Sequence, residues 1–189
     1  MKKLLILLPA LLIVAACAKA PSSELSSLSI PDSYDSSDSE EAKTYTATLT
    51  KNNCGLTTDD STEEIVATVK SKQDSEVEYS VKIGAPCYLS DKYNEFIMKQ
   101  GGYVKSNSNY HVDRLIIDFF GKKGTNYDVY ANVDGTGEKI AYHESSIQPE
   151  DPNDGGIVYE YPINGTEWCI SNSTVYKPAF YSITIVFSK

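Results

Sequence analysis

Apolar and polar residues alternate with a period of two through most of the chain after residue 43. In segment 44–51, the apolar residues fall on one side and four threonines fall on the other. The same alternation runs through segments 65–71, 77–84, 127–133, 157–163 and 180–187. Successive side chains of a β-strand point to opposite faces, so this spacing indicates strands that are buried on one face. The chain therefore favours an all-β fold.

Turn-forming residues separate these segments and predict how they connect. Asn164-Gly165 suits a two-residue type I′ hairpin, because both central positions of that turn need a positive φ. Asp134-Gly135-Thr136-Gly137 suits a hairpin loop that leads into a returning strand at 139–144. We expect about ten short strands, which predicts a single antiparallel β-sandwich, jelly-roll-like, over residues 44–189.

Two segments depart from simple alternation. Segment 115–120 is apolar on both faces, which is typical of a central strand that is covered on each side. Segment 91–99 fits either a helical turn or a short strand at 95–99, and we predict the strand.

The final strand carries a resemblance to known modules. The run from Lys177 to Phe187, with its Pro-Ala-Phe-Tyr start, looks like the last strand of jelly-roll modules in secreted proteins of low-GC bacteria. Those modules are similar in architecture to carbohydrate-binding modules. The resemblance covers the second half of the domain and implies a jelly-roll fold with a sugar-binding role.

The first seventeen residues carry an export signal. Lys2 and Lys3 precede an apolar run, Leu4 to Ala16, that Pro9 interrupts. As a helix this run spans roughly 20 Å, less than the ~30 Å hydrocarbon core of a bilayer. Charge, length and a small-residue end together predict a signal peptide at 1–16.

Val14-Ala15-Ala16-Cys17 resembles the lipobox of bacterial lipoproteins. The resemblance implies that Cys17 becomes the first residue of the mature chain, carries acyl chains and inserts them into membrane lipid. The alternative is an ordinary cleaved signal with a chance cysteine. Residue 18 is alanine and not the aspartate that resembles an inner-membrane retention signal, which favours the outer membrane or cell surface of the cell envelope.

Residues 17–43 form a polar linker in this interpretation. Segment 18–43 holds nine serines and six acidic residues, too few apolar groups to offset the entropy of ordering the chain. The whole sequence has a net charge of -9. Binding nucleic acid requires a basic face, so we exclude nucleic acid as a partner.

Three cysteines remain in the predicted domain: Cys54, Cys87 and Cys169. Outside the cytoplasm thiols often pair, and we favour a Cys54–Cys87 disulfide because both residues lie at strand ends. Three reduced thiols are the alternative. The spacings contain no close ligand pair of the kind that zinc needs, so we predict neither a metal nor another cofactor.

Acidic clusters near two loops raise the question of calcium. They comprise Asn132, Asp134 and Glu138, and Glu150, Asp151 and Asp154. Asp, Asn and Gly are also the residues that hairpin turns prefer, and we interpret both clusters as turns.

Tyrosine supplies the candidate ligand contacts, because sugar rings stack on flat aromatic side chains. Tyr130 lies on the opposite side of its strand from the apolar residues, and four further tyrosines lie in or near loops: Tyr88, Tyr93, Tyr110 and Tyr176. Tyr127, Tyr159, Tyr161 and Trp168 share a face with aliphatic residues and are expected in the core.

No motif for catalysis is present. His111 and His143 are isolated, and the sequence lacks GxSxG, HExxH and phosphate-binding loops. The sequence therefore predicts a non-enzymatic, membrane-anchored binding protein, with a glycan or polysaccharide as ligand. The alternative is a structural or adhesive surface subunit that binds a protein partner.

Overall fold

Two antiparallel β-sheets make up the part of the chain that the structure describes. The structure is a computed structural model that describes residues 42–120, 125–144 and 156–189. These residues form twelve strands, belong to one unit, Ser39–Lys189, and contain no helix that could span a membrane. The predicted signal peptide, Cys17 and nearly all of the predicted linker lie outside the described residues.

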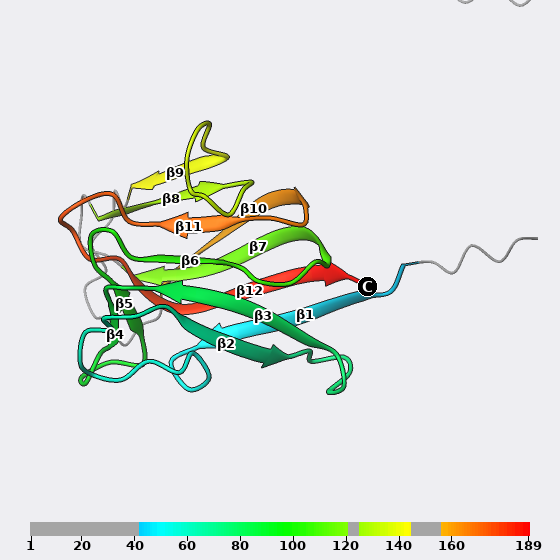
Figure 1. The fold of residues 1–189 in the computed structure, drawn as a ribbon, viewed down its shortest axis with the longest axis horizontal. Helices are drawn as coiled ribbons and strands as arrows, with labels where there is room; N and C mark the ends of the chain where they lie inside the picture. The colour runs from blue at the N-terminus through cyan, green and yellow to red at the C-terminus, as the bar shows by residue number, and fades with distance from the viewer. Residues whose placement is uncertain (1–41, 121–124, 145–155) are drawn as a thin grey trace, which may run out of the picture. The chain divides into compact units, whose positions relative to one another are not determined.

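Sheet A has the strand order β10-β7-β12-β5-β4, and β1 also pairs with β12 (Figure 1). Its strands are β1 (Thr44–Thr50), β4 (Cys87–Leu89), β5 (Phe96–Met98), β7 (His111–Phe120), β10 (Ile157–Gly165) and β12 (Ala179–Ser188). Sheet B has the order β2-β3-β6-β11-β8-β9. Its strands are β2 (Ile65–Lys70), β3 (Glu78–Gly84), β6 (Tyr103–Ser106), β8 (Asn126–Tyr130), β9 (Ala141–Glu144) and β11 (Cys169–Ser171).

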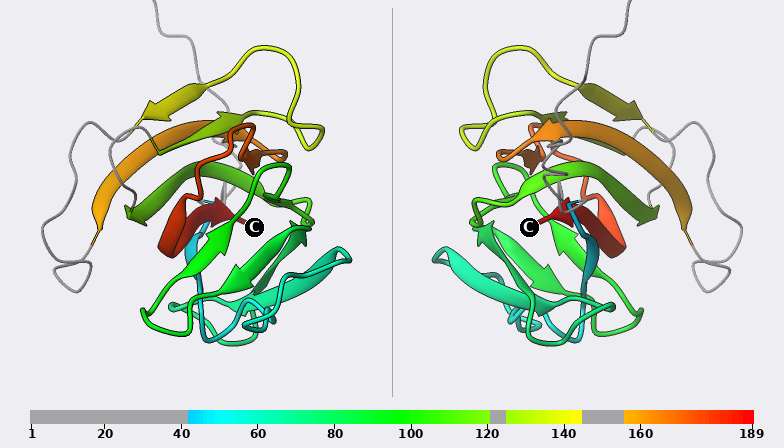
Figure 2. Two further views of the ribbon diagram at one scale, coloured as in Figure 1. Left: turned by 90° about the vertical axis from the view of Figure 1, so that its left-hand side faces the viewer. Right: turned by 90° about the vertical axis from the view of Figure 1, so that its right-hand side faces the viewer.

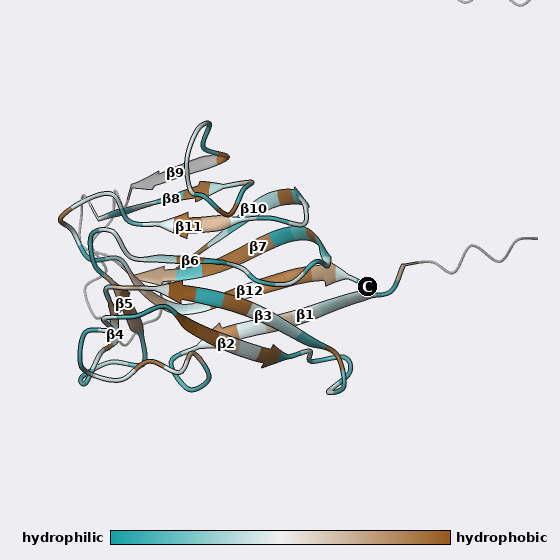
Figure 3. Ribbon diagram, viewed as in Figure 1, coloured by the Kyte–Doolittle hydropathy of each residue, from teal (hydrophilic) through white to brown (hydrophobic). Residues whose placement is uncertain are grey.

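Figure 2 shows the arrangement of the strands from the two ends. The buried side chains of the two sheets form one hydrophobic core. Brown and teal residues alternate along the strands in Figure 3, because one face of each strand is apolar. The prediction of an all-β, antiparallel, sandwich-like fold is therefore confirmed. The short strand predicted at 95–99 is also present, as β5.

Aromatic side chains fill the core between the sheets. Trp168 is fully buried and donates its indole N–H to the hydroxyl of Tyr79 at 3.0 Å. Tyr127 is also fully buried, and its hydroxyl lies 2.8 Å from that of Tyr161. These pairs satisfy polar atoms that would otherwise be costly to bury. The predicted core positions of Trp168, Tyr127 and Tyr161 are confirmed, and Tyr159 packs against the core half-buried.

Strands β7 and β8 differ from the sequence prediction in opposite directions. β7 lies centrally, between β10 and β12, but only one of its faces is fully buried, and Ile116 and Phe120 on the other face are half-exposed. β8 was expected to be half-buried, yet all five of its residues are buried. A second layer must therefore cover the outer face of β8.

The turn at Asn164 also differs from the prediction. Asn164 has a φ of 51°, in the left-handed region that the dipeptide suits. The flanking strands do not form a hairpin, however, because β10 pairs with β7 in sheet A and β11 pairs with β6 and β8 in sheet B. Asn164 and Gly165 instead belong to β10, whose register shifts between Pro162 and Gly165, and residues 166–168 carry the chain from sheet A to sheet B.

Candidate functional site

Three adjoining hollows lie along the outer face and one end of sheet B, and together they form what we call the sheet B groove. The first, of about 440 Å³, is lined by Thr68, Glu78, Ser80, Ser108, Asn109 and Tyr110. The second, of about 220 Å³, is lined by Ser106, Asn107, Ser108, Asn109, Val133, Thr166 and Glu167. The third, of about 290 Å³, is lined by Gly101, Tyr103, Lys105, Val133, Asp134, Gly135, Cys169 and Ser171. Ser108 and Asn109 line the first two hollows, and Val133 lines the last two, so neighbouring hollows share lining residues.

The first two hollows are shaped by the connection between β6 and β7. Ser108 accepts a hydrogen bond from the backbone N–H of Ser80 at 2.9 Å, and Asn107 donates from its side-chain amide to the hydroxyl of Ser80 at 3.1 Å. Tyr110 stacks on Phe187, with ring centroids 5.3 Å apart. The connection is therefore held against β3 and the core, and it presents hydroxyl and amide groups to the hollows.

In the third hollow, the ring of Tyr103 lies flat on the sheet over Gly84. A Cβ atom at Gly84 would lie only 2.1 Å from ring atoms of Tyr103, so the close approach requires glycine. The Tyr103 hydroxyl donates to Glu64 at 2.6 Å, and the ammonium of Lys105 lies 4.7 Å from the ring centroid. Lys82 pairs with the same Glu64 carboxylate at 3.1 Å.

These contacts shift two ionisation equilibria. The Glu64 carboxylate holds the phenolic proton and raises the pKa of Tyr103 to about 12. Reciprocally, the hydrogen bond from Tyr103, followed by the contact with Lys82, lowers the pKa of Glu64. Glu64 is ionised in this arrangement and fixes the tyrosine in one orientation.

The far wall of the third hollow is the β8–β9 loop, residues 131–140. The Asn132 carboxamide oxygen accepts the backbone N–H groups of Asp134 at 3.1 Å and Gly135 at 2.8 Å. Its amide group donates to the carbonyl of Thr136 at 3.0 Å. Gly135 has a positive φ, and a Cβ there would lie 3.2 Å from the Cys169 sulfur. The loop is therefore closed internally and lies against the outer face of β11.

A buried carboxylate ties the same loop to β8. The side chain of Asp128 is 2% exposed and receives the ammonium of Lys139, from the loop, at 2.9 Å. Ser173, from the segment after β11, donates to its other oxygen at 3.1 Å. Beside it, Thr174 donates to Asn126 at 3.0 Å. Two connecting segments thus cover the outer face of β8, which explains why all residues of that strand are buried.

The structure corrects the prediction that Tyr130 is a ligand contact. Its position on the outer side of β8 is as expected, but only 7% of its surface is exposed. The covering loop approaches it, since a Cβ at Gly135 would lie 4.0 Å from its ring. Tyr130 therefore cannot offer a ring face to a ligand.

The structure separates the four loop tyrosines. Tyr110 lines the first hollow of the sheet B groove. Tyr88, Tyr93 and Tyr176 line none of the three hollows, and they come from β4, the β4–β5 loop and the β11–β12 loop. Lysine ammonium groups lie over the rings of Tyr88 and Tyr93, at 5.2 and 4.9 Å, while Tyr176 is 53% exposed.

Tyr103 is the groove residue that the sequence analysis missed. Its position beside Val104, which is fully buried, places it on the outer face together with Lys105. The alternation in Tyr103-Val104-Lys105 was the available signal.

The predicted disulfide between Cys54 and Cys87 is wrong for this structure. Cys54, Cys87 and Cys169 are all buried free thiols. Cys54 donates its S–H to the carbonyl of Lys51 at 3.5 Å, and Cys87 donates to that of Gly84 at 3.1 Å. Burial raises the pKa of Cys87 to about 12. The thiols of Cys54 and Cys87 are thus satisfied by the backbone in their reduced form.

No histidine is among the described residues that line the sheet B groove. His111 lies 3.6 Å from Asp113, with both side chains well exposed, and lines none of the three hollows. The side chain of His143 lies outside the described residues. Of the two acidic clusters interpreted above as turns, Asn132 uses its side chain to close the loop, while Glu150, Asp151 and Asp154 lie outside the described residues. The described residues contain no group of three or more potential metal ligands.

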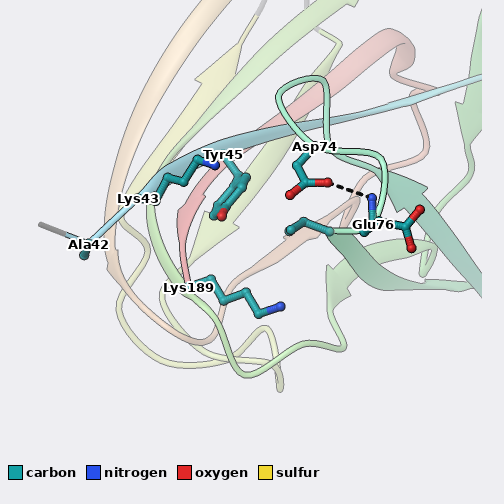
Figure 4. Close-up of a pocket in the computed structure, with 7 residues that line it drawn as sticks. Ala42, Lys43, Tyr45, Asp74, Glu76 and Lys189 are labelled. Atoms are coloured by element: carbon teal, nitrogen blue, oxygen red, sulfur yellow. Dashed lines mark hydrogen bonds between the residues drawn. The ribbon is translucent and has the colours of Figure 1, made fainter. Parts of the chain in front are cut away.

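A separate cavity of about 680 Å³ lies where β1 begins (Figure 4). It is lined by Ala42, Lys43, Tyr45, Asp74, Glu76, Val77 and Lys189. In Figure 4 the two acidic side chains lie on the opposite side of the cavity from Lys43. Because Ala42 and Lys189 are the first and last described residues, this cavity is bounded by the ends of the described chain. The three hollows of the sheet B groove are lined by strands and their connections and not by the ends of the described chain, and we take this groove as the candidate site.

Comparison with known proteins identifies no relative: no protein-family model, no curated protein and no solved structure matches this chain.

Proposed function

We propose that this chain is an extracytoplasmic lipoprotein, held at a membrane through Cys17, whose β-sandwich binds a glycan in the sheet B groove without catalysing a reaction. The observation that supports this proposal most is that the three hollows adjoin one another through shared lining residues. Their lining is rich in hydroxyl and amide side chains: Thr68, Ser80, Ser106, Asn107, Ser108, Asn109, Thr166 and Ser171.

This lining matches the chemistry of a sugar polymer. Hydroxyl and amide groups both donate and accept hydrogen bonds, as sugar hydroxyls do. Tyr103 and Tyr110 add an aromatic side chain to the third and first hollows. A ligand that repeats along its length can occupy adjoining hollows, whereas a compact ligand needs only one. An extended glycan therefore uses the whole groove.

The distribution of exposed apolar residues gives less support to a protein partner. Val66, Val158, Val175 and Tyr176 are the exposed large hydrophobic residues of the described chain. They lie on β2, β10 and the β11–β12 loop, so only the last two are neighbours in sequence. A protein interface of the kind proposed as the alternative uses a contiguous apolar patch of several hundred Å² or an unpaired strand edge. Strands β2 and β10, which carry Val66 and Val158, are edge strands of their sheets.

A glycan array tests the binding proposal. The domain from Thr44 onward is screened beside the triple variant Asn109→Ala/Thr166→Ala/Glu167→Ala, whose three side chains are exposed and line the groove. The matched control is Asn94→Ala/Thr62→Ala/Asp91→Ala, which also removes an Asn, a Thr and an acidic residue, at exposed positions outside the groove. We expect the groove variant to bind a hit at least tenfold more weakly, about 1.4 kcal/mol, and the control to bind as the parent does. Equal binding by all three proteins, or no hit, contradicts the proposal.

A separate experiment tests the anchor. The full chain expressed in a bacterium should partition into detergent and carry acyl chains on Cys17 by mass spectrometry. Cys17→Ser should move to the aqueous phase, because the acyl chains supply the membrane affinity. An unmodified Cys17 in the natural product contradicts this half of the proposal.

A further inference from the structure

The dipeptide Asn164-Gly165, at the end of β10, is not used by the proposed glycan function. It is the only Asn-Gly pair in the sequence. Asparagine is among the chemically labile residues of proteins, because the backbone nitrogen of the next residue can attack its side-chain carbonyl carbon. A side chain on the next residue crowds that nitrogen, and glycine carries none. The pair therefore combines the reactive amide with the least hindered neighbour.

The structure leaves both reacting groups open. The side chain of Asn164 is exposed, and none of the described residues forms a hydrogen bond with it. A Cβ atom placed on Gly165 would meet only the carbonyl oxygen of Ile163 within 4 Å, at 3.9 Å. Water and the attacking nitrogen can therefore both reach the Asn164 amide.

The backbone at this point is not held by a regular ladder. The register between β10 and β7 shifts between Pro162 and Gly165, so that Ile163 and Asn164 have no partner residue in β7. Asn164 also has a φ of 51°, in the left-handed region that most residues avoid. The rotation that brings the Asn164 side chain onto the next nitrogen therefore disturbs less structure here than it would within a paired strand.

Two other asparagines that precede a small residue, serine, are held in place by contrast. Asn107 donates its side-chain amide to the hydroxyl of Ser80 at 3.1 Å. Asn172 is only 1% exposed. Its amide group donates to the carbonyl oxygens of Met98 at 3.1 Å and Tyr176 at 2.6 Å. These contacts keep both amides away from the following backbone nitrogen.

We infer that Asn164 is a site of spontaneous deamidation. The Gly165 nitrogen bonds to the side-chain carbonyl carbon of Asn164, the bond from that carbon to the amide nitrogen breaks, and ammonia leaves with the proton from Gly165. Water then opens the resulting cyclic imide at either of its carbonyl groups, which gives aspartate or isoaspartate. The net reaction consumes water and releases ammonia. It is independent of the proposed glycan function, since it requires only this dipeptide and water.

The modification changes the chain directly before the second hollow of the sheet B groove. Thr166 and Glu167 line that hollow, and Trp168 after them is fully buried. Both products add a negative charge, and isoaspartate also lengthens the main chain by a methylene group, because the peptide bond then runs through the side-chain carbon. Since Trp168 is fixed in the core, residues 165–167 must take up the added length.

The experiment incubates the purified protein at mildly alkaline pH, where the attacking nitrogen loses its proton more readily. Peptide mapping with mass spectrometry follows each asparagine, and a fragmentation method that distinguishes isoaspartate from aspartate identifies the products. We expect Asn164 to be converted to both acids while Asn107 and Asn172 keep their amides. If Asn164 keeps its amide for as long as those two residues, the inference is wrong.

The variant Gly165→Ala tests the attacking group. Its Cβ has room, and Gly165 does not have a positive φ, so the variant should fold as the parent does, which urea unfolding checks. We expect it to lose most of the conversion at Asn164, because the new side chain crowds the nitrogen. Conversion at the parent's rate would show that this nitrogen does not attack the amide and would overturn the inference.

Discussion

The outer faces of the two sheets use polar residues in different ways. On sheet A, Arg114 and Glu160 form an ion pair at 2.6 Å with both side chains well exposed, and Thr48 and Thr184 share a hydrogen bond at 2.9 Å. On sheet B, the carboxylate of Asp128 is buried beneath two connecting segments. The first face is a solvated surface, whereas the second contains a buried polar layer that positions a loop.

The difference matters because that loop is a wall of the candidate site. Val133, Asp134 and Gly135 line the third hollow, and the loop that carries them is held through Lys139 on Asp128. Exposed ion pairs contribute little to stability, while a buried charge that loses its partners is costly. Substitutions on the two faces should therefore have very different effects on the free energy of unfolding.

Asp128→Ala should have the largest effect. It removes the acceptor that holds Lys139 and Ser173 and leaves a gap beneath the loop. We expect the free energy of unfolding to fall by about 2–3 kcal/mol, less than for a fully buried pair because Lys139 is partly exposed. Urea unfolding measures the change. Asp134→Ala, on the same loop but exposed, should stay within about 0.5 kcal/mol. Equal effects of the two substitutions would show that the buried layer is not what holds the loop.

Gly84→Ala should have the next largest effect. Its Cβ would lie 2.1 Å from the ring of Tyr103, so the ring must leave the sheet surface. We expect a loss of about 1–2 kcal/mol and weaker glycan binding, because the third hollow loses its tyrosine. The control is the same substitution in a Tyr103→Ala background, where the clash is absent and the cost should nearly vanish. A cost that persists without Tyr103 would assign the effect to the backbone.

Glu64→Gln should change an ionisation more than the stability. The pKa of Tyr103, about 12, should fall toward 10, because the carboxylate that holds its proton is gone. The sign follows from linkage: a raised pKa in the folded state gives stability that is present below pH 10 and lost as the pH rises through about 12. NMR titration of the Tyr103 ring carbons measures the shift. An unchanged pKa would mean that burial, and not Glu64, causes it.

The alternation of residues predicted the faces of the strands well. Tyr45, Ala47 and Leu49 are buried on one side of β1, and Tyr103 and Lys105 lie on the outer side of β6, as their spacing implies. Alternation is a local property of extended backbone, so it can be found in the sequence. It says which way a side chain points and nothing about what covers it.

The segments that cover the outer face of sheet B therefore could not be predicted from the alternation of residues. Tyr130 was expected to be exposed because it alternates with Val129, yet the β8–β9 loop and the segment after β11 bury it with Asp128. Ser173 is 45 residues from Asp128 in sequence, and no local pattern connects them. The sheet B groove has the same origin, since its lining comes from five separate segments. Likewise, Asn164 has the positive φ that the dipeptide suits, but the predicted hairpin turn is wrong, because Asn164 and Gly165 end β10 and the next strand belongs to the other sheet.

Thr184→Val, on sheet A, should have the smallest effect. The substitution removes the hydrogen bond to Thr48, but the Thr48 hydroxyl is only partly buried and can turn to water. We expect the free energy of unfolding to change by less than about 0.5 kcal/mol. Ser173→Ala, in the segment after β11, removes one hydroxyl donor from the carboxylate of Asp128, whose side chain is only 2% exposed, and it should cost about 1 kcal/mol or more. If the two hydroxyl deletions cost the same, then burial of the acceptor is not what distinguishes the faces, and the loop over sheet B must be held by its own internal hydrogen bonds from Asn132.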